Sequence, residues 1–119
     1  MKLTFLGTGT SQGIPEIGCD CKVCNSKDIK DKRNRCSILL SDDKNNILVD
    51  CGPDFRHQAL KANIKKIDYV LITHTHADHI FGLDDLRVFA NNLNNTEALK
   101  IFCNSNSIQD IKLRFNYLF

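Results

Sequence analysis

The segment HTHADH at residues 74–79 constrains what this chain can fold into more than any other part of its sequence. It contains three of the four histidines, and it directly follows a nearly continuous apolar run at residues 67–73. Such a run is typical of a strand buried on both faces. The histidines therefore lie at the carboxyl end of a strand, which is where α/β folds usually place their ligands.

The residue types and spacing in this segment predict a metal site. Imidazole and carboxylate groups are natural ligands for zinc, manganese and iron. Side chains two apart on an extended chain point the same way, so His74 and His76 can share one metal. Asp78 and His79 come as the chain turns into the next helix and point elsewhere. The four donors suit two adjacent metals better than one tetrahedral ion, and the competing interpretation is a polar loop that happens to contain histidines.

The remaining pattern predicts an α/β fold with a mixed sheet, because strands come first and helices then alternate with strands. The turn at residues 41–45 separates two strands of a hairpin. Ser107 is a plausible N-cap for the last helix. We expect strands at residues 2–6, 36–40, 46–51, 67–73 and 100–103, a long loop at 11–32, and helices at 55–62, 83–93 and 108–118.

Cys19, Cys21 and Cys24 form a CxCxxC motif inside this long loop. Three thiolates in a loop that has no other reason to be ordered predict a structural zinc. Similar spacings bind mercury or copper, and a redox pair or unligated thiols are the other interpretations. A zinc site needs a fourth ligand, for which Cys36 and His57 are the local candidates.

The other thiols and the overall composition exclude several classes of protein. Cys36, Cys51 and Cys103 stand alone among apolar neighbours and are predicted to be buried free thiols, which favours a reducing cytoplasm. The longest apolar run is far below the ~20 residues that span a bilayer. Sixteen basic and fourteen acidic residues give a net charge of +2, which argues against a nucleic-acid partner.

Several motifs together resemble those of a known family. Residues 74–79 resemble the HxHxDH motif of the metallo-β-lactamase superfamily, and ILVDCG at residues 47–52 resembles its aspartate-bearing strand. FLGTGT at residues 5–10 also resembles the opening strand of that superfamily. Within the superfamily, GCDCKVC at residues 18–24 and NRCS at 34–37 resemble the PhnP-like phosphodiesterases, which are related to ribonuclease Z. The similarity extends from residue 1 to about residue 90.

This resemblance implies the N-terminal half of an αββα sandwich and a hydrolase with two divalent metals, zinc or manganese. His74 and His76 would bind the first metal, and Asp78 and His79 the second. Asp78 would also orient the attacking hydroxide held between the metals, and Asp50 would support the metal ligands from behind. The substrate would be a small phosphodiester, including cyclic ribose phosphates.

The resemblance also implies a second half that this sequence does not contain. In the family that half supplies a histidine, a bridging aspartate and a final histidine, together with a histidine as fourth ligand of the structural zinc. Residues 1–119 are therefore expected to be the N-terminal portion of one metallo-β-lactamase-like domain. Alternatives are another hydrolase of this fold, of the ribonuclease Z, thioester or lactone type, or a non-catalytic metal-binding half-domain that forms a homodimer through its open sheet face.

Overall fold

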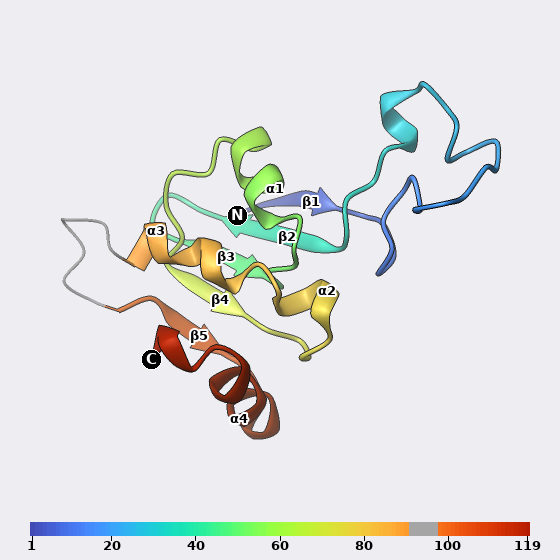
Figure 1. Ribbon diagram of the computed structural model, residues 1–119. Coiled ribbons are helices and arrows are strands. Elements are labelled where there is room, and N and C mark those ends of the chain that lie inside the picture. The colour runs from blue at the N-terminus through green and yellow to red at the C-terminus, as the bar shows by residue number, and fades with distance from the viewer. Residues whose placement is uncertain (91–97) are drawn as a thin grey trace.

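The strands of the protein follow one another across a single sheet in the same order as along the chain, β1-β2-β3-β4-β5 (Figure 1). The computed structural model describes residues 1–90 and 98–119. The first three strands pair antiparallel and the last three pair parallel, which confirms the mixed sheet of an α/β fold. The strands are β1 (Lys2–Gly7), β2 (Ser37–Ser41), β3 (Asn46–Val49), β4 (Tyr69–Leu71) and β5 (Lys100–Phe102).

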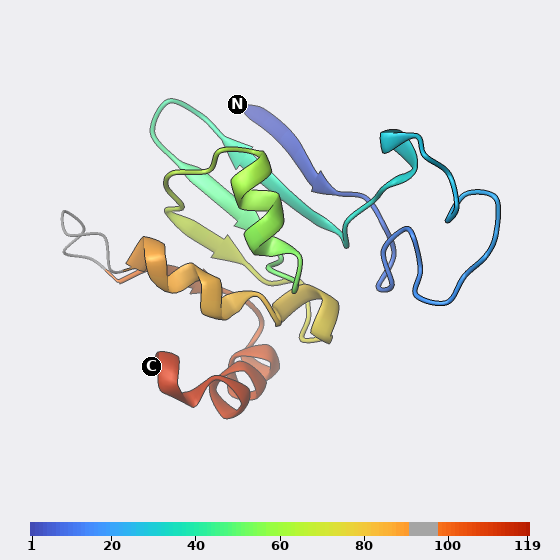
Figure 2. The ribbon, with the colours of Figure 1, turned by 45° about the horizontal axis from the view of Figure 1, so that its top comes forward.

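Helices connect the parallel strands and cover one face of the sheet (Figures 1 and 2). On this face Leu48 and Val70 are fully buried beneath Phe55 of the first helix. The helices are α1 (Phe55–Lys61), α2 (Ala77–Ile80), α3 (Arg87–Ala90) and α4 (Ser105–Arg114), with 3-10 turns η1 (Ile29–Asp31), η2 (Leu83–Leu86) and η3 (Asn116–Leu118). None of the described helices has the length and apolar character needed to cross a membrane.

The opposite face of the sheet carries a row of apolar side chains that no described residue covers. Phe5, Ile38, Val49, Leu71 and Phe102 are cross-strand neighbours in register, one from each strand. Neighbours in register point to the same face. Phe5 is 67% exposed and Phe102 51% exposed, so this apolar row faces solvent.

The prediction that residues 67–73 are buried on both faces is wrong. Val70 and Ile72 are buried against the helices, whereas Leu71 between them is 37% exposed on the open face. Apolar side chains alternate between the two faces of a strand, and the described helices lie on only one of them. The strand is also shorter than expected: it covers Tyr69–Leu71, and α2 begins at Ala77.

Two expected helices differ in detail from the prediction. The second begins as η2 and continues as α3, and its predicted end at Leu93 lies outside the described residues. The N-cap of α4 is Asn104 and not Ser107. The Asn104 side chain accepts the Ser107 amide at 2.8 Å, which an asparagine does as well as a serine, and Ser107 itself is buried within the first turn.

The long loop predicted at residues 11–32 extends away from the sheet, and η1 is the one helical turn described within it (Figure 1). Ile14 and Arg33 exchange two backbone hydrogen bonds of 2.8 Å at its base. The Arg35 backbone amide and guanidinium both donate to Asp54 at 2.8 Å. Because Arg35 Nε also donates to the Ser11 carbonyl at 2.8 Å, the loop is fastened to the start of α1.

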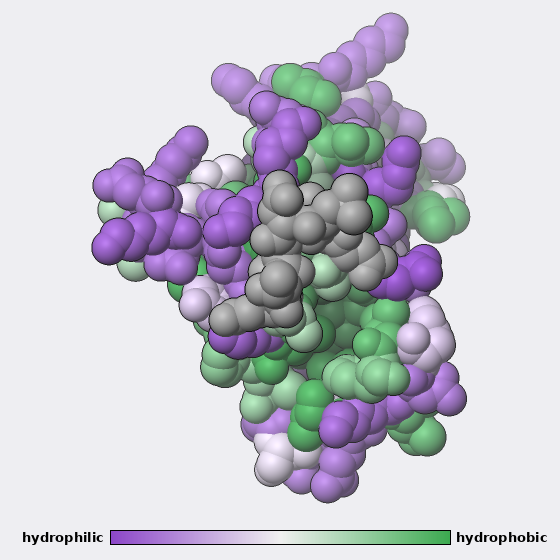
Figure 3. Space-filling view, turned by 90° about the vertical axis from the view of Figure 1, so that its left-hand side faces the viewer, coloured by the Kyte–Doolittle hydropathy of each residue, from purple (hydrophilic) through white to green (hydrophobic). Residues whose placement is uncertain are grey.

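An apolar cleft of about 420 Å³ opens between α3 and α4 (Figure 3). Among the described residues its lining contains no imidazole, thiol or carboxylate side chain, so it offers no metal ligand. Its lining includes Leu86, Leu99, Ile108 and Leu118.

Candidate metal centres

The turn that carries the histidines packs closely against the chain that follows β3. The Cys51 amide donates to the His79 carbonyl at 2.7 Å, and the Gly82 amide donates to the Cys51 carbonyl at 2.9 Å. A Cβ atom on Gly52 would lie 2.0 Å from the carbonyl oxygen of Asp78. Only glycine permits this approach, so the backbone of α2 and of the residues just after it is held in place by the segment that follows β3.

Asp50 is buried at the end of β3 and connects this segment to the histidines. It is 4% exposed and has a left-handed φ of 59°, a conformation that aspartate tolerates better than most residues. One carboxylate oxygen accepts the Thr73 amide at 2.8 Å. The other accepts both the Thr73 hydroxyl and His79 Nδ1, each at 2.8 Å.

This hydrogen-bond pattern assigns the tautomers of two histidines. Because the Asp50 carboxylate accepts from His79 Nδ1, that nitrogen carries a proton, and Nε2 is the nitrogen that faces the Asp78 carboxylate at 3.2 Å. The Thr73 hydroxyl has one hydrogen, which it donates to Asp50, so it accepts from His74 Nδ1 at 3.0 Å. His74 Nε2 is therefore the acceptor nitrogen of that ring, and it accepts from His76 Nδ1 at 3.2 Å.

The four predicted ligands meet in two pairs. His74 Nε2 lies 3.2 Å from His76 Nδ1, and His79 Nε2 lies 3.2 Å from the Asp78 carboxylate. Two ligands about 2.05 Å from one zinc at a tetrahedral angle would be about 3.3 Å apart. Each pair therefore fits two ligand positions of one metal, and the ring centroids of His74 and His79, one from each pair, are 4.0 Å apart.

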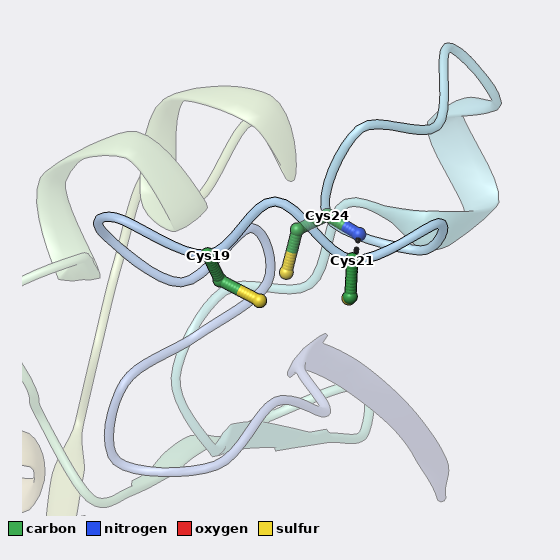
Figure 4. A group of neighbouring side chains, drawn as sticks. All are labelled: Cys19, Cys21 and Cys24. Atoms are coloured by element: carbon green, nitrogen blue, oxygen red, sulfur yellow. Dashed lines mark hydrogen bonds between the residues drawn. The ribbon is translucent and has the colours of Figure 1, made fainter.

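The second predicted metal centre, the CxCxxC motif, brings its ligand atoms close together. Cys19, Cys21 and Cys24 are the one group of three or more ligand-type residues, within the described part of the chain, whose ligand atoms all lie within 4.8 Å of one another (Figure 4). The Glu16 amide donates to Cys24 Sγ and the Cys24 amide donates to Cys21 Sγ, both at 3.4 Å. The loop is thus folded so that its thiols converge.

The hydrogen bonds also give Cys21 and Cys24 different pKa values. The Cys24 backbone amide and the Cys19 thiol lower the pKa of Cys21 to about 7. The Glu16 amide lowers the pKa of Cys24, but the contact with Cys19 and partial burial outweigh it and raise the pKa overall. Cys21 is therefore more readily a thiolate near neutral pH than Cys24, and the thiolate is the form that binds a metal.

The two local candidates for a fourth ligand do not join this group: Cys36 and His57 are both exposed and lie outside it. The prediction of a buried thiol is confirmed at Cys51 and wrong at Cys36. Ser37 points into the protein at the start of β2, so its neighbour Cys36 points out. Cys103 is half-buried, and burial raises its pKa.

Thr73 is the site residue that sequence reasoning missed. It is the hydroxyl residue immediately before the first histidine, and that position was its one signal in the sequence. Its role depends on Asp50, 23 residues earlier, and so becomes visible only when β3 and β4 are side by side.

A mixed sheet with helices against it, and an HxHxDH turn leading out of a parallel strand, define the metallo-β-lactamase fold. The chain belongs to the beta-lactamase superfamily domain family, whose model matches residues 45–119. A diphosphatase from the PhnP family has a similar structure, with a TM-score of 0.93 and 47% identity over 98% of this chain and 46% of that one. The predicted resemblance to PhnP-like proteins is thereby confirmed.

Other proteins similar to this chain have names that describe different activities. The short form of human tRNase Z matches with a TM-score of 0.70 and 27% identity, over 99% of this chain and 40% of that one. Ribonuclease Z of Pediococcus pentosaceus is 40% identical over 86% of this chain and 30% of its own length. An octanoyltransferase of Porphyromonas gingivalis is 47% identical over 100% of this chain but 24% of its own length. The chain spans less than half the length of each of these relatives.

Proposed function

We propose that the protein containing this chain is a metal-dependent hydrolase of phosphodiesters. The observation that carries the proposal is the meeting of four donors in two pairs at the end of β4, His74 with His76 and Asp78 with His79, each 3.2 Å apart. Two divalent metals, zinc or manganese, would be held there, and when bound they supply Lewis-acid activation of water and neutralise charge on phosphate oxygens.

The chain's own residues prepare this site before any metal arrives. Asp50 holds the proton on His79 Nδ1 and, through Thr73, on His74 Nδ1, so both rings present Nε2. Fixing a ligand's tautomer from behind raises its basicity and removes the cost of reorienting it. Asp78 is half-buried beside His79, and in the proposal it both binds metal and orients the attacking water.

A diphosphate is the second candidate substrate, since the PhnP-family relative with a TM-score of 0.93 is a diphosphatase. Cleavage of a phosphodiester and of a diphosphate both displace a leaving group from phosphorus, so one site serves either chemistry. The name octanoyltransferase does not extend to this chain, because about three quarters of that relative lies outside the match.

The test is a substrate panel on the full-length protein, loaded with manganese or zinc. We expect turnover of bis-p-nitrophenyl phosphate, and Asp78→Ala is expected to remove it. Turnover of a dialkyl diphosphate in preference to the diester would favour the second candidate, and cleavage of a tRNA precursor would favour ribonuclease Z chemistry. Unchanged turnover in Asp78→Ala would contradict the proposal.

We further propose that Cys19, Cys21 and Cys24 bind a structural zinc. Their convergence within 4.8 Å and the pKa of about 7 at Cys21 support this. All six cysteines lie among the described residues and none is in a disulfide, in keeping with the proposed cytoplasmic location. Metal analysis should show one zinc fewer in Cys21→Ser than in the unaltered protein, and an equal zinc content would contradict the assignment.

The open sheet face supports a proposal about the rest of the domain. Phe5, Leu71 and Phe102 expose an apolar row that the second half of an αββα sandwich would cover. A second copy of the chain is the competing occupant. Size-exclusion chromatography distinguishes these two occupants. The full-length protein should not self-associate through this face, whereas the isolated 119 residues should.

A further inference from the structure

Helix α4 reaches the histidine turn through two charged side chains. Arg114 donates from its guanidinium to the Thr75 carbonyl at 3.2 Å. The same guanidinium pairs through Nε with Asp110, one turn earlier on the helix, at 3.0 Å. The Thr75 hydroxyl in turn hydrogen-bonds to Asp110, and this bond is the largest cause that lowers the pKa of that carboxyl. Thr75 is therefore held at both its carbonyl and its hydroxyl.

The helix that delivers this pair is itself firmly placed. Ile111 is fully buried between the two charged positions, and Phe115 is 8% exposed in the same core. The ring of Phe115 packs edge-on against Phe81, which directly follows α2, with centroids 6.2 Å apart. The start of the helix is capped by Asn104. Arg114 and Asp110 thus project from a fixed support onto the turn.

Thr75 is the single residue between His74 and His76, and restraining it restrains the backbone that separates the two imidazoles. We propose that the Asp110–Arg114 pair is a positioning clamp that sets the 3.2 Å spacing between His74 Nε2 and His76 Nδ1. The inference rests on the proposed function in one respect, namely that this histidine pair binds a metal.

The effect of the clamp falls on metal binding and not on folding. Arg114 and Asp110 are 41% and 31% exposed, and ion pairs this open to solvent contribute little to stability. The bond from Arg114 to a backbone carbonyl is charge-assisted and directional, so it fixes geometry. Groups that orient metal ligands in this way typically change metal affinity 10- to 100-fold when removed.

The experiment titrates Mn²⁺ into the full-length protein and follows free Mn²⁺ by electron paramagnetic resonance. Manganese prefers nitrogen and oxygen donors, so the cysteine site does not compete. Arg114→Ala and Asp110→Asn should each weaken binding by about 10- to 100-fold with an unchanged melting temperature. Arg114→Lys should recover only part of the affinity, because one ammonium does not reproduce both contacts of the guanidinium. Lys112→Ala, an exposed cation on the same helix, is the matched control and should bind as the unaltered protein does.

Two further outcomes separate this inference from the proposed function. If the unaltered protein binds Mn²⁺ but cleaves no phosphoester, the proposed function fails and the titration still tests the clamp. Unaltered Mn²⁺ affinity in Arg114→Ala and Asp110→Asn would overturn the clamp while leaving the hydrolase intact. Absence of Mn²⁺ binding at the histidines of the unaltered protein would overturn both. If the clamp acts only through affinity, kcat of Arg114→Ala should return to normal at saturating Mn²⁺.

Discussion

Replacing Asp50 with asparagine should reverse the tautomers of two histidines while leaving the backbone in place. Asparagine tolerates the left-handed φ of 59° as aspartate does, so the fold at the end of β3 is retained. The oxygen that accepts the Thr73 amide can remain an acceptor, but the other becomes an NH₂ donor. His79 Nδ1 must then accept a hydrogen bond, which moves the proton of that ring to Nε2. The Thr73 hydroxyl turns to donate to His74 Nδ1, so the proton of His74 also moves to Nε2.

The magnitude follows from the hydrogen bonds at stake. To bind a metal, each ring must move its proton back and give up the hydrogen bond that the introduced amide group would have offered. That bond, between neutral groups, contributes roughly 0.5–1.5 kcal/mol, and the metal-bound ring also loses its bond to the charged Asp50 carboxylate, which contributes roughly 1.5–3 kcal/mol. Since 1.4 kcal/mol is tenfold, we expect about 10- to 100-fold weaker metal binding from each ring in Asp50→Asn. Stability should fall by only about 1–2 kcal/mol, because each lost bond is replaced by its reverse.

The assay has two parts, performed on the full-length protein. Long-range ¹H–¹⁵N spectra of the metal-free protein report which imidazole nitrogen carries the proton, and chelator competition reports the affinity for Mn²⁺ or Zn²⁺. Asp68→Asn is the matched control, since Asp68 is a half-buried carboxylate that, like Asp50, accepts a backbone amide, at the other end of β4. Retention of Nδ1 protons on His74 and His79 in Asp50→Asn, with unaltered metal affinity, would refute the reasoning.

Three other predictions concern the backbone, the thiols and the open face. Gly52→Ala should destabilise the protein by about 1–3 kcal/mol or more in chemical denaturation, because its Cβ would meet the Asp78 carbonyl at 2.0 Å; a wild-type midpoint would show that the turn is free to move. Alkylation of metal-free protein should label Cys21 with a rate that is half-maximal near pH 7 and rises with pH as the thiolate forms, whereas Cys24 needs a higher pH; equal rates at pH 7 would contradict the assigned acidities. In the isolated 119 residues, Phe102→Glu should reduce self-association in sedimentation experiments, and undiminished association would place the contact elsewhere than on the open sheet face.

Local sequence signals predicted the features that depend on local chemistry. The hairpin turn is an example: Asp42 accepts the amides of Lys44 and Asn45, which is the short-range bonding that makes such residues turn formers. The same holds for the histidine segment, because its ligand types and their spacing lie within six residues.

Features that depend on distant parts of the chain escaped prediction. Whether Leu71 is buried is decided by what covers the far face of the sheet, and the residues around it carry no sign of that. The tautomer of His74 depends on Asp50 through Thr73, and the support of Thr75 comes from α4. Each of these contacts joins segments more than twenty residues apart, so periodicity and spacing contain no information about them.

The order of the strands has a consequence for how this chain can fold as it is synthesised. Each new strand pairs with the one made just before it, so the sheet extends at one edge without waiting for a later segment. Asp50 at the end of β3 meets Thr73 as soon as β4 has joined the sheet. The histidines can therefore acquire their proton arrangement while β5 and α4 are still being made, and the contact from Arg114 to Thr75 comes last.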